Sequence, residues 1–487
     1  MRAATPVLNL YRCVLEAATP LSIGAGRGDG VQDQLLALDA NGLPFLPASS
    51  LAGVMRQAVA DLDGAGPDAA RELFGYAEGS FGAASRLEIS HGHIHDSLDR
   101  PVEALLAEVD DPLLRPLVEH KPRLRQRVRI GHRGAADRTG LFNRSVLPAG
   151  HRFSVEFALW SAEPAPREHA WLVALLGAGL LRLGGLTRSG LGLMKPVRLH
   201  HREWQLASAA ELADFAVLPR SLASTAGLRP LAIAAVDGPH RRAVLELAPE
   251  AGFRFGDGEV SLLKNRRPGD KPADDLPKTE ARVQWSEGRG RLGEPQPLVP
   301  AASVKGALAH RVAFHADRLE RRWASPARLK DHDKALHNPT VRRLFGHAGD
   351  ETADERGQAG VIWIADAWLR PQDVVAQRQM HNSIDRFTGG VRDGLLFTVE
   401  NLHGAAPCVL RLELGLDLRR ARALGATARD FEALELALED LCQGRLALGA
   451  DSAGGQGFFS GTLRWNHASA PSAEFAAAEA QNQEEQR

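Results

Sequence analysis

Apolar and polar residues alternate in two similar segments of the chain that lie about 230 residues apart. Residues 11–17 read YRCVLEA, and residues 241–248 read RRAVLELA. A period of two turns one face of each segment toward a core and the other toward solvent. The pattern therefore predicts a strand at both places.

Helical spacing follows each predicted strand after a proline, at Pro47 and at Pro300. Proline is tolerated at the start of a helix but not in its interior, so both prolines mark a beginning. Ser49, Ser50 and Ser303 stand where a hydroxyl group can cap the first turn. We therefore expect two helices that begin at these prolines and are capped by serines.

The last helix of the second half has the clearest start signal. Thr427 is followed three residues later by Asp430, which is the spacing of a capping box. Phe431, Leu434 and Leu438 then recur at helical spacing. The pattern predicts an amphipathic helix that begins at Thr427.

Four blocks of sequence occur twice in the same order. The matched pairs are 44–59 with 297–312, 73–75 with 344–346, 134–142 with 383–397, and 183–194 with 448–459. The period is far longer than that of solenoid repeats, so the blocks indicate two homologous domains. Each copy has two strand–helix–strand units, which predicts a ferredoxin-like α+β core.

The repeat defines the expected organisation of the chain. We expect a first domain over residues 1–205, a linker over 206–237 and a second domain over 238–468. The tail, residues 469–487, is small, acidic and poor in large apolar residues, which predicts disorder.

Composition narrows the function classes. Of 487 residues, 44% are hydrophobic and 24% charged, which is typical of a globular protein. Three scattered cysteines exclude a disulfide scaffold and a cysteine-cluster zinc site. The sequence contains no signal-peptide pattern and no apolar run long enough to span a bilayer, so we expect a cytoplasmic protein without a membrane partner.

The net charge of −1 argues against a generally basic nucleic-acid binder, but one segment is strongly basic. As a strand, residues 123–130 place four arginines on one face: Arg123, Arg125, Arg127 and Arg129. Like charges that are neighbours on one face of a strand destabilise a sheet unless an anion neutralises them. A charged edge strand that resists aggregation is the alternative. RNA is the better explanation of the stripe.

Glycine loops and helix starts extend this hypothesis. The glycines of 183–194 follow a helix and precede a strand, which is the reverse of the dinucleotide-binding order. They indicate either turns with positive φ or a backbone that phosphates approach closely. The serines at the helix starts, with Arg56 and Lys305 nearby, fit ordinary caps and phosphate sites equally well.

Two further clusters have a chemical and a plain interpretation. His91, His93 and His95 alternate and suit zinc or acid–base chemistry, but a polar strand face is favoured. Asp29 and Asp33 lie on a glycine-dense loop, where a carboxylate can hold Mg²⁺ or assist phosphodiester cleavage. From the residues alone, an ordinary surface turn is favoured there.

Taken together, the blocks resemble a known family. GLPFLPASSLAGVMR, IGHRGAADRTGLFNRSVLPAGHRF and LGGLTRSGLGLM are similar to the RAMP superfamily of CRISPR-associated proteins. Within it they look most like the backbone subunit of type III effector complexes, here in a fused two-copy form. HNSIDRFTGGVRDGLLFTVENL resembles that subunit's thumb hairpin. The resemblance implies two tandem modified RNA-recognition folds, each with an inserted thumb hairpin.

The resemblance also implies an activity. It implies a subunit that binds crRNA, cleaves complementary target RNA with a divalent metal such as Mg²⁺, and assembles with other type III effector subunits. The catalytic and metal-binding position falls on Asp33, with Asp29 as the fallback. In the second copy Asp274 and Asp275 are the plausible carboxylates, while Glu280, or no catalytic residue, stays open.

Two alternatives and a set of RNA-binding residues complete the hypothesis. The first alternative is a non-catalytic backbone that binds crRNA. The second is a crRNA-processing endoribonuclease that uses His132 or His91. The residues expected to contact RNA are Ser49, Ser50, Arg56, Arg123, Arg125, Arg127, Arg129, His132, Arg133, Arg138, Gly185, Arg188, Gly190, Ser303, Lys305, Arg386, Gly454 and Gly455.

Overall fold

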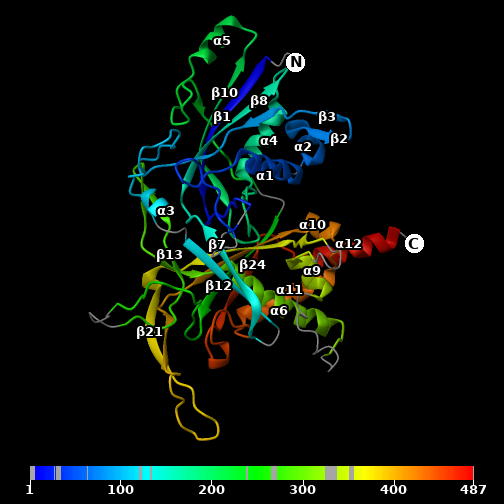
Figure 1. Cartoon of the computed structure of the whole chain (residues 1–487). Helices are drawn as coiled ribbons and strands as arrows, with labels where there is room; N and C mark the ends of the chain where they lie inside the picture. Colours follow the sequence, from blue (N-terminus) through cyan, green and yellow to red (C-terminus); the bar gives the residue numbers. More distant parts are fainter. Residues whose placement is uncertain are drawn as a thin grey trace.

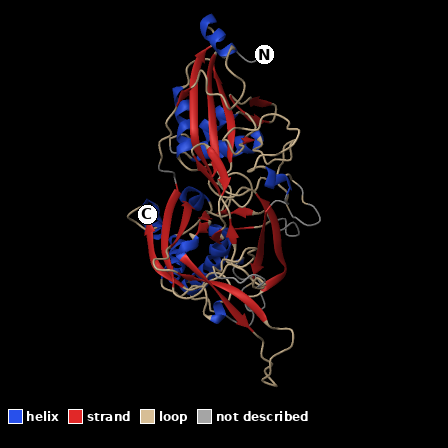
Figure 2. Cartoon of the chain, turned by 90° about the vertical axis from the view of Figure 1, so that its left-hand side faces the viewer, coloured by secondary structure: helices blue, strands red, loops and turns tan. Residues whose placement is uncertain are grey.

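The computed structural model describes residues 6–26, 28, 34–62, 64–119, 123–131, 134–236, 240–264, 271–323, 337–349 and 356–485. The two sequence repeats form two bodies, one above the other (Figure 2). We call them the first repeat and the second repeat.

The first repeat and the segment after it contain the following elements. They are β1 (Val7–Ala17), α1 (Ala48–Asp61), α2 (Gly66–Phe74), β2 (Tyr76–Glu78), β3 (Phe81–Ala83), β4 (Leu87–Ile89), β5 (His93–Ile94), α3 (Arg115–Glu119), β6 (Arg123–Ile130), β7 (Ala136–Val146), β8 (Arg152–Ser161), α4 (Pro166–Gly177), β9 (Ser189–Gly190), β10 (Met194–Gln205), α5 (Ala209–Ala216) and β11 (Arg229–Pro230).

The second repeat and the tail contain the remaining elements. They are β12 (His240–Pro249), β13 (Thr279–Glu280), β14 (Val283–Ser286), β15 (Arg289–Leu292), β16 (Gln296–Val299), α6 (Ala301–Leu319), α9 (Pro339–Phe345), β17 (Gly346–His347), β18 (Gln358–Ala359), β19 (Ile362–Ala365), β20 (Ala367–Trp368), η2 (Pro371–Asp373), β21 (Val374–His381), β22 (Phe397–Gly404), β23 (Leu410–Asp417), α10 (Leu418–Ala423), α11 (Ala428–Cys442), η3 (Ser452–Gly454), β24 (Phe459–Trp465) and α12 (Pro471–Glu485).

Both repeats have the same sheet topology. The central order is β10-β1-β8-β4 in the first repeat and β24-β12-β23-β19 in the second, and all of these neighbours pair antiparallel. In each, one helix connects the first strand to the edge strand (α1, α6) and another connects the third to the fourth (α4, α11). This is the ferredoxin-like arrangement, so the predicted α+β fold is confirmed.

Each repeat has its own hydrophobic core. In the first, Leu51 and Met55 of α1 pack with Leu15 of β1 and Phe153 of β8. In the second, the predicted stripe on α11, which contains Phe431, is fully buried. Apolar side chains of the two repeats thus fall into separate buried clusters, as expected for two domains.

Helix starts were predicted only in part. The Thr427–Asp430 capping box is present. By contrast, Pro47 and Pro300 are themselves the cap residues of α1 and α6, and neither start has a side-chain cap. Ser49 and Ser303 lie inside the first turn, so their hydroxyls stand too far along the helix to cap it.

The tail differs from the disorder that its composition predicted. Residues 471–485 form α12. Phe475 is buried and packs against Phe431 in a tilted arrangement with ring centroids 4.5 Å apart, and the Arg241 guanidinium pairs with the Glu474 carboxylate. One large apolar residue at the right position therefore docks an otherwise alanine-rich helix.

The expected linker is also structured. It contains α5, whose Phe215 packs edge-on against Trp204, and β11, which extends the first sheet. The buried Arg12 donates hydrogen bonds to the carbonyls of Pro219 and Ser221 at 2.7 and 3.0 Å. Residues 206–236 thus pack onto the first repeat.

Two long hairpins leave the repeats. The β6–β7 hairpin crosses from the first repeat onto the second, whereas the β21–β22 hairpin projects away from the body (Figure 1). They occupy the same place in the two repeats, between the edge strand and the third strand of the sheet. This agrees with one inserted hairpin per copy.

Candidate nucleic-acid interface

The glycine loop of the first repeat, residues 183–194, docks on the second repeat. Its strand β9 pairs in parallel with Ile364 and Ala365 of β19. Gly190 has φ of 97°, and a Cβ there would lie 2.2 Å from Oδ1 of Asp366. Only glycine permits this approach. The structure therefore places Gly190 in a contact between repeats, where the sequence suggested RNA.

Arg125 was expected on the RNA-binding stripe, but it is buried in the same contact. Its guanidinium lies 2.5 Å from the Asp366 carboxylate and 2.5 Å from the Glu280 carboxylate. Burial lowers the pKa of Arg125, but the two carboxylates outweigh it and raise that pKa. Alternation placed the arginine on one strand face correctly, but another domain's carboxylates cover that face. Glu280 was one of the alternatives for the catalytic carboxylate of the second copy, and in the structure it forms an ion pair with Arg125.

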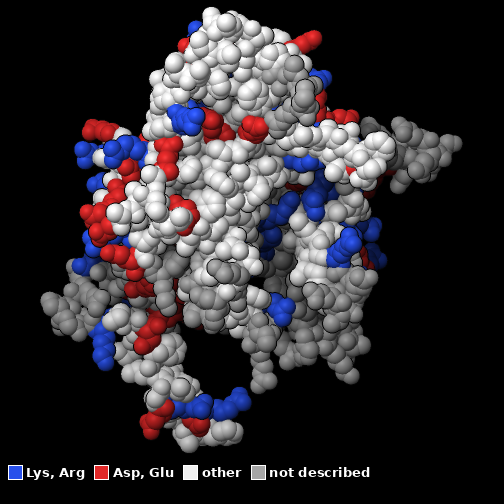
Figure 3. Space-filling view, turned by 45° about the horizontal axis from the view of Figure 1, so that its top comes forward, with Lys and Arg blue, Asp and Glu red and all other residues white. Residues whose placement is uncertain are grey.

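The next arginine of the stripe lies in a different environment. Arg127, Arg188 and Lys305 form a cluster at the junction of the repeats, which we call the basic seam. Among the described residues none of the three forms an ion pair. Lys and Arg side chains gather in a recess on the face drawn in Figure 3. Unpaired neighbouring cations are destabilising unless an anion joins them.

Mutual repulsion within the basic seam is visible in its pKa values. Burial, Arg188 and Arg127 lower the pKa of Lys305 to about 8. Burial and Arg144 lower the pKa of Arg127. Within the part of the chain that the structure describes, the Lys305 ammonium donates only to the carbonyl of Arg188, at 3.3 Å. A phosphate chain would relieve this repulsion.

One cation of this region escaped the sequence analysis. Arg182 is largely buried, and its guanidinium lies 4.1 Å from the ring centroid of Trp363. Burial, Arg242 and Arg188 lower its pKa to about 10. Its position directly before the glycine loop was the available signal. It continues the basic seam on the other side of Arg188.

The helix starts are not equally available to phosphate. In the second repeat the Ala301 amide donates to Oδ1 of Asp366 at 2.8 Å, so a carboxylate already occupies this start. In the first repeat the Ala48 amide donates to Nδ1 of His91 at 3.1 Å. Ser49 and Ser303 are exposed.

Of the remaining positively charged candidates, Arg56 donates to the carbonyl of Gly75 at 3.0 Å and is otherwise exposed. Arg129 is exposed. The side chains of Arg123 and Arg138, and all of His132 and Arg133, lie outside the described residues.

The two glycine loops have the same backbone. Positive φ occurs at Gly184, Leu186, Gly190 and Gly192, and again 265 positions later at Gly449, Asp451, Gly455 and Gly457. Gly185 admits the Arg144 guanidinium, which would lie 2.0 Å from a Cβ there. Ser50 is half-buried, and Gly454 and Gly455 are exposed. The turn interpretation therefore holds in both loops.

Asp29 and Asp33 lie outside the described residues, but the registers around them identify an equivalent. Gln34 bridges Arg144 in parallel, and Asp275 bridges Val399 in parallel. Arg144 and Val399 occupy the same place in the two hairpins. Three residues after them, Leu147 bridges Leu21 and Leu402 bridges Phe253, and both partners lie in the loop that follows the first strand of their repeat. Asp33 and Asp274 each directly precede these matched residues.

Asp274 is an exposed carboxylate beside the outer end of the paired β21 and β22 strands, where Thr398 pairs with Met380. Its Oδ2 accepts hydrogen bonds from the amide and hydroxyl of Thr398 at 2.7 and 3.0 Å. These bonds lower the pKa of Asp274, so it is ionised at neutral pH. Asp275 is different, because it pairs with Arg254 at 2.9 Å. Of the two candidates, Asp274 is the accessible one.

The tip of that hairpin is apolar as well as charged. Phe387 is 91% exposed and Ile384 54% exposed. Asp385 accepts bonds from the amides of Phe387 and Thr388 at 2.9 Å each and so shapes the tip. Arg386 is exposed beside them. Such a tip presents an aromatic face and a cation, the pair of groups that stack on bases and hold phosphates.

The three histidines do not share a site. His95 is buried between Asp99 and Ser154, both at 2.8 Å, and His93 lies 3.2 Å from the carbonyl of Val102. Within the described ranges, no group of three His, Cys, Asp or Glu side chains is placed to hold a metal. The polar-strand interpretation fits these contacts.

No helix of the described residues is long and apolar enough to cross a membrane. No curated protein matches the chain. A family model does match, over residues 14–195 and 282–460, and it is the model of the RAMP superfamily. The first range covers most of the first ferredoxin-like body, and the second covers the second body from β14 to β24 without its first strand, β12. RAMP proteins are CRISPR-associated and bind RNA. The chain therefore belongs to the RAMP superfamily and holds two copies of its domain.

Proposed function

We propose that the chain is a subunit of a type III CRISPR effector ribonucleoprotein that binds crRNA and cleaves complementary target RNA. The observation that carries the binding half is the basic seam. None of its three cations forms an ion pair among the described residues. Burial and Arg420 lower the pKa of Arg188 more than Asp417 and Asp61 raise it, and burial together with repulsion depresses the pKa of Lys305. Phosphates supply the missing charge.

RNA binding is tested by Arg127→Gln, with Arg370→Gln as the matched control. Arg127 lies in the basic seam, whereas Arg370 pairs with Asp373 on the surface. Losing one phosphate contact should weaken RNA binding and reduce the slope of log K against log salt by about 0.7. Equal slopes for both variants would remove the basic seam from the RNA interface.

The cleavage half rests on Asp33 and Asp274. Mg²⁺ is usually held by one or two carboxylates together with waters and substrate phosphates, so it needs no cluster of three protein ligands. The exposed, ionised Asp274 fits this requirement, and Asp33 is its counterpart in the first repeat. The metal would stabilise charge on the phosphate, while Thr398 fixes the direction of the Asp274 carboxylate.

Cleavage is tested with Asp33→Asn and Asp274→Asn in the assembled complex with guide RNA, target RNA and Mg²⁺. Each substitution should remove the cuts made by its own repeat, by about 100-fold or more. Asp373→Asn serves as the control. If both variants cut like the unmodified complex, the chain is a non-catalytic crRNA-binding backbone. Cutting of repeat RNA in EDTA would instead indicate a processing endoribonuclease.

A further inference from the structure

The strand face that holds Asp274 in place also carries a cation. Thr398 of β22 donates two hydrogen bonds to Asp274 and pairs with Met380 of β21, and Arg378 lies two residues before Met380. Side chains two residues apart on a strand, and those of directly paired residues, share one face of a sheet. Arg378 therefore lies on the Asp274 side of the β21–β22 hairpin, whose place in the fold is drawn in Figure 1.

Arg378 also contacts the segment that carries Asp274. Its Nη2 donates to the carbonyl of Lys271, three residues before Asp274, at 2.5 Å. The hydrogen bonds from Thr398 and, more weakly, the charge of Arg378 lower the pKa of Asp274. The guanidinium is therefore within electrostatic reach of the carboxylate.

The carboxylate that faces Arg378 across the hairpin is already engaged. Glu400 pairs with Arg378 in the strand register, but it is fully buried and accepts bonds from the Ser261 hydroxyl and the Leu262 amide at 2.6 Å each. Within the described part of the chain Arg378 forms no ion pair, and its Nε is buried without a hydrogen-bond partner. An arginine with unused donors thus lies beside an ionised carboxylate, and a phosphate would supply its counter-charge.

The first repeat does not have this cation. Two pairs are matched by the register of the hairpins: Gln379 with Val399, and Arg125 with Arg144. The residue before each of the first partners is then matched as well, which places Leu124 where Arg378 stands. The two repeats share the matched aspartates Asp33 and Asp274 but differ in this charge.

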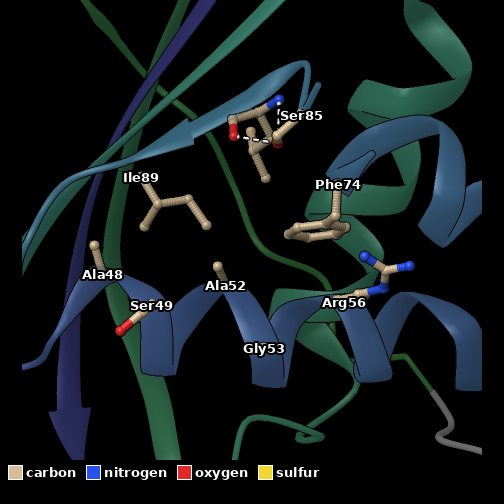
Figure 4. A pocket seen from close by; sticks show the side chains of 9 residues that line it. Ala48, Ser49, Ala52, Gly53, Arg56, Phe74, Ser85 and Ile89 are labelled. Carbon is tan, nitrogen blue, oxygen red and sulfur yellow. Dashed lines mark hydrogen bonds between the residues drawn. The ribbon is translucent and has the colours of Figure 1, made fainter. Parts of the chain in front are cut away.

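The pocket beside α1 in the first repeat does not offer the same pair of groups. It is open, has a volume of about 390 Å³ and lies between α1 and β4 (Figure 4). Arg56 is its cation and donates to the carbonyl of Gly75. Of the described residues that line it, none is a carboxylate. The pocket therefore lacks the acidic group that the Asp274 site has.

Phosphodiester cleavage builds negative charge on the phosphate. An attacking hydroxyl oxygen forms a bond to phosphorus and gives its proton to water. The bond from phosphorus to the leaving 5′ oxygen breaks, and that oxygen takes up a proton from water. Between these events charge collects on the two non-bridging oxygens, so a guanidinium beside them stabilises the transition state more than the resting phosphate.

We propose that Arg378 is a catalytic residue of the second repeat and donates hydrogen bonds to a non-bridging oxygen of the phosphate that is cut beside Asp274. The first repeat, with Leu124 at the matched position, cuts without this group. The inference rests on the proposed function, because it assigns a second residue to the same cleavage site.

The test is single-turnover cleavage of target RNA by the assembled complex, in which the cuts of the second repeat are those that Asp274→Asn removes. Arg378→Gln should slow these cuts about 100-fold. Cuts by the first repeat should be unchanged, which shows that the variant folds and assembles. Arg378→Lys keeps the charge without the planar fork and should recover part of the rate.

Two controls separate this effect from weaker binding and from a general loss of charge. Affinity for target RNA, measured in EDTA, should change by less than about threefold in Arg378→Gln, because pairing with the guide supplies most of it. Arg411→Gln should cut like the unmodified complex, since Arg411 pairs with Glu413 on β23.

A phosphorothioate at the cut distinguishes contact with the phosphate from anchoring of the loop through Lys271. In the diastereomer whose sulfur replaces the contacted oxygen, Arg378→Gln should slow cleavage by less than about tenfold, because that contact is already weakened. Ser261→Ala loosens the same insert at Glu400 and should slow the oxygen and sulfur substrates by equal factors.

The outcomes separate this inference from the proposed function. Cuts that persist in Arg378→Gln but disappear in Asp274→Asn would overturn the inference and leave the proposed function intact. Equal slowing of the oxygen substrate and both sulfur diastereomers by Arg378→Gln would also overturn it, since Arg378 would then only anchor the loop. Unchanged cutting by Asp274→Asn would overturn both.

Discussion

In the second repeat the edge strand β19 carries β9 beside it, whereas in the first repeat no strand of the described residues lies on the outer side of the equivalent strand, β4. The two edges share sheet order, helix positions and loop geometry. They differ at a few side chains: Asp366 against His91, and Lys305 against Ala52. The same fold therefore carries a charged contact at the edge strand β19 and a surface without these charges at the edge strand β4. The exchanged side chains decide this difference, and the fold is the same with either set.

The largest effect on stability should come from the buried ion pair between the two repeats, in which Arg125 contacts Asp366 and Glu280. Arg125→Ala leaves Asp366 and Glu280 buried without a counter-charge and should lower the free energy of unfolding by about 3–5 kcal/mol. Gln379→Ala, at the matched position of the β21–β22 hairpin, should cost about 1 kcal/mol. Chemical denaturation measures both. Similar losses would mean that the two hairpins are not used differently.

Glycine substitutions should separate the two loops by a smaller margin. Gly190→Ala places a Cβ 2.2 Å from Asp366, so strain from overpacking of about 1–3 kcal/mol adds to the cost of positive φ. Gly455→Ala should carry only the latter cost, of about 1–2 kcal/mol. The difference in unfolding free energy between the two variants, measured at low protein concentration, reports the contact itself.

The smallest effect concerns pH. Lys305 has a pKa of about 8 in the RNA-free protein, and a bound phosphate favours its charged form. RNA binding should therefore take up a proton above pH 8, and affinity should fall by up to about tenfold as the pH rises from 7 to 9. Lys305→Arg keeps its charge throughout and should flatten this dependence. Titrations of RNA affinity against pH decide the matter, and parallel curves would exclude Lys305 from the interface.

Local signals in the sequence predicted local structure well. The capping box at Thr427 was correct because both partners lie within one turn of the same helix. The repeated blocks predicted two ferredoxin-like bodies because each block encodes one strand, turn or helix of that fold. The tail was different, since a single docked side chain, Phe475, outweighs an alanine-rich composition.

The alternation of residues along the sequence could not predict the contacts between the two repeats. Alternation told which arginines share a strand face, but not that Asp366 and Glu280, more than 150 positions away, cover Arg125. The equivalence of Asp33 and Asp274 was hidden because the loops before them differ in length. Only the pairing of Gln34 and Asp275 with matched hairpin residues aligned them.

If the proposed function holds, the basic seam has a consequence for how the chain contacts a long RNA strand. Its three cations correspond to His381, Ala453 and Ala52 at the matched positions of the opposite repeat, so they arise once per chain and not once per fold. His381 even stacks on Phe397 as Arg127 lies over Phe142. A strand laid along successive domains would be held tightly at every second junction and loosely at those between. The electrostatic repeat length would then be twice the structural one.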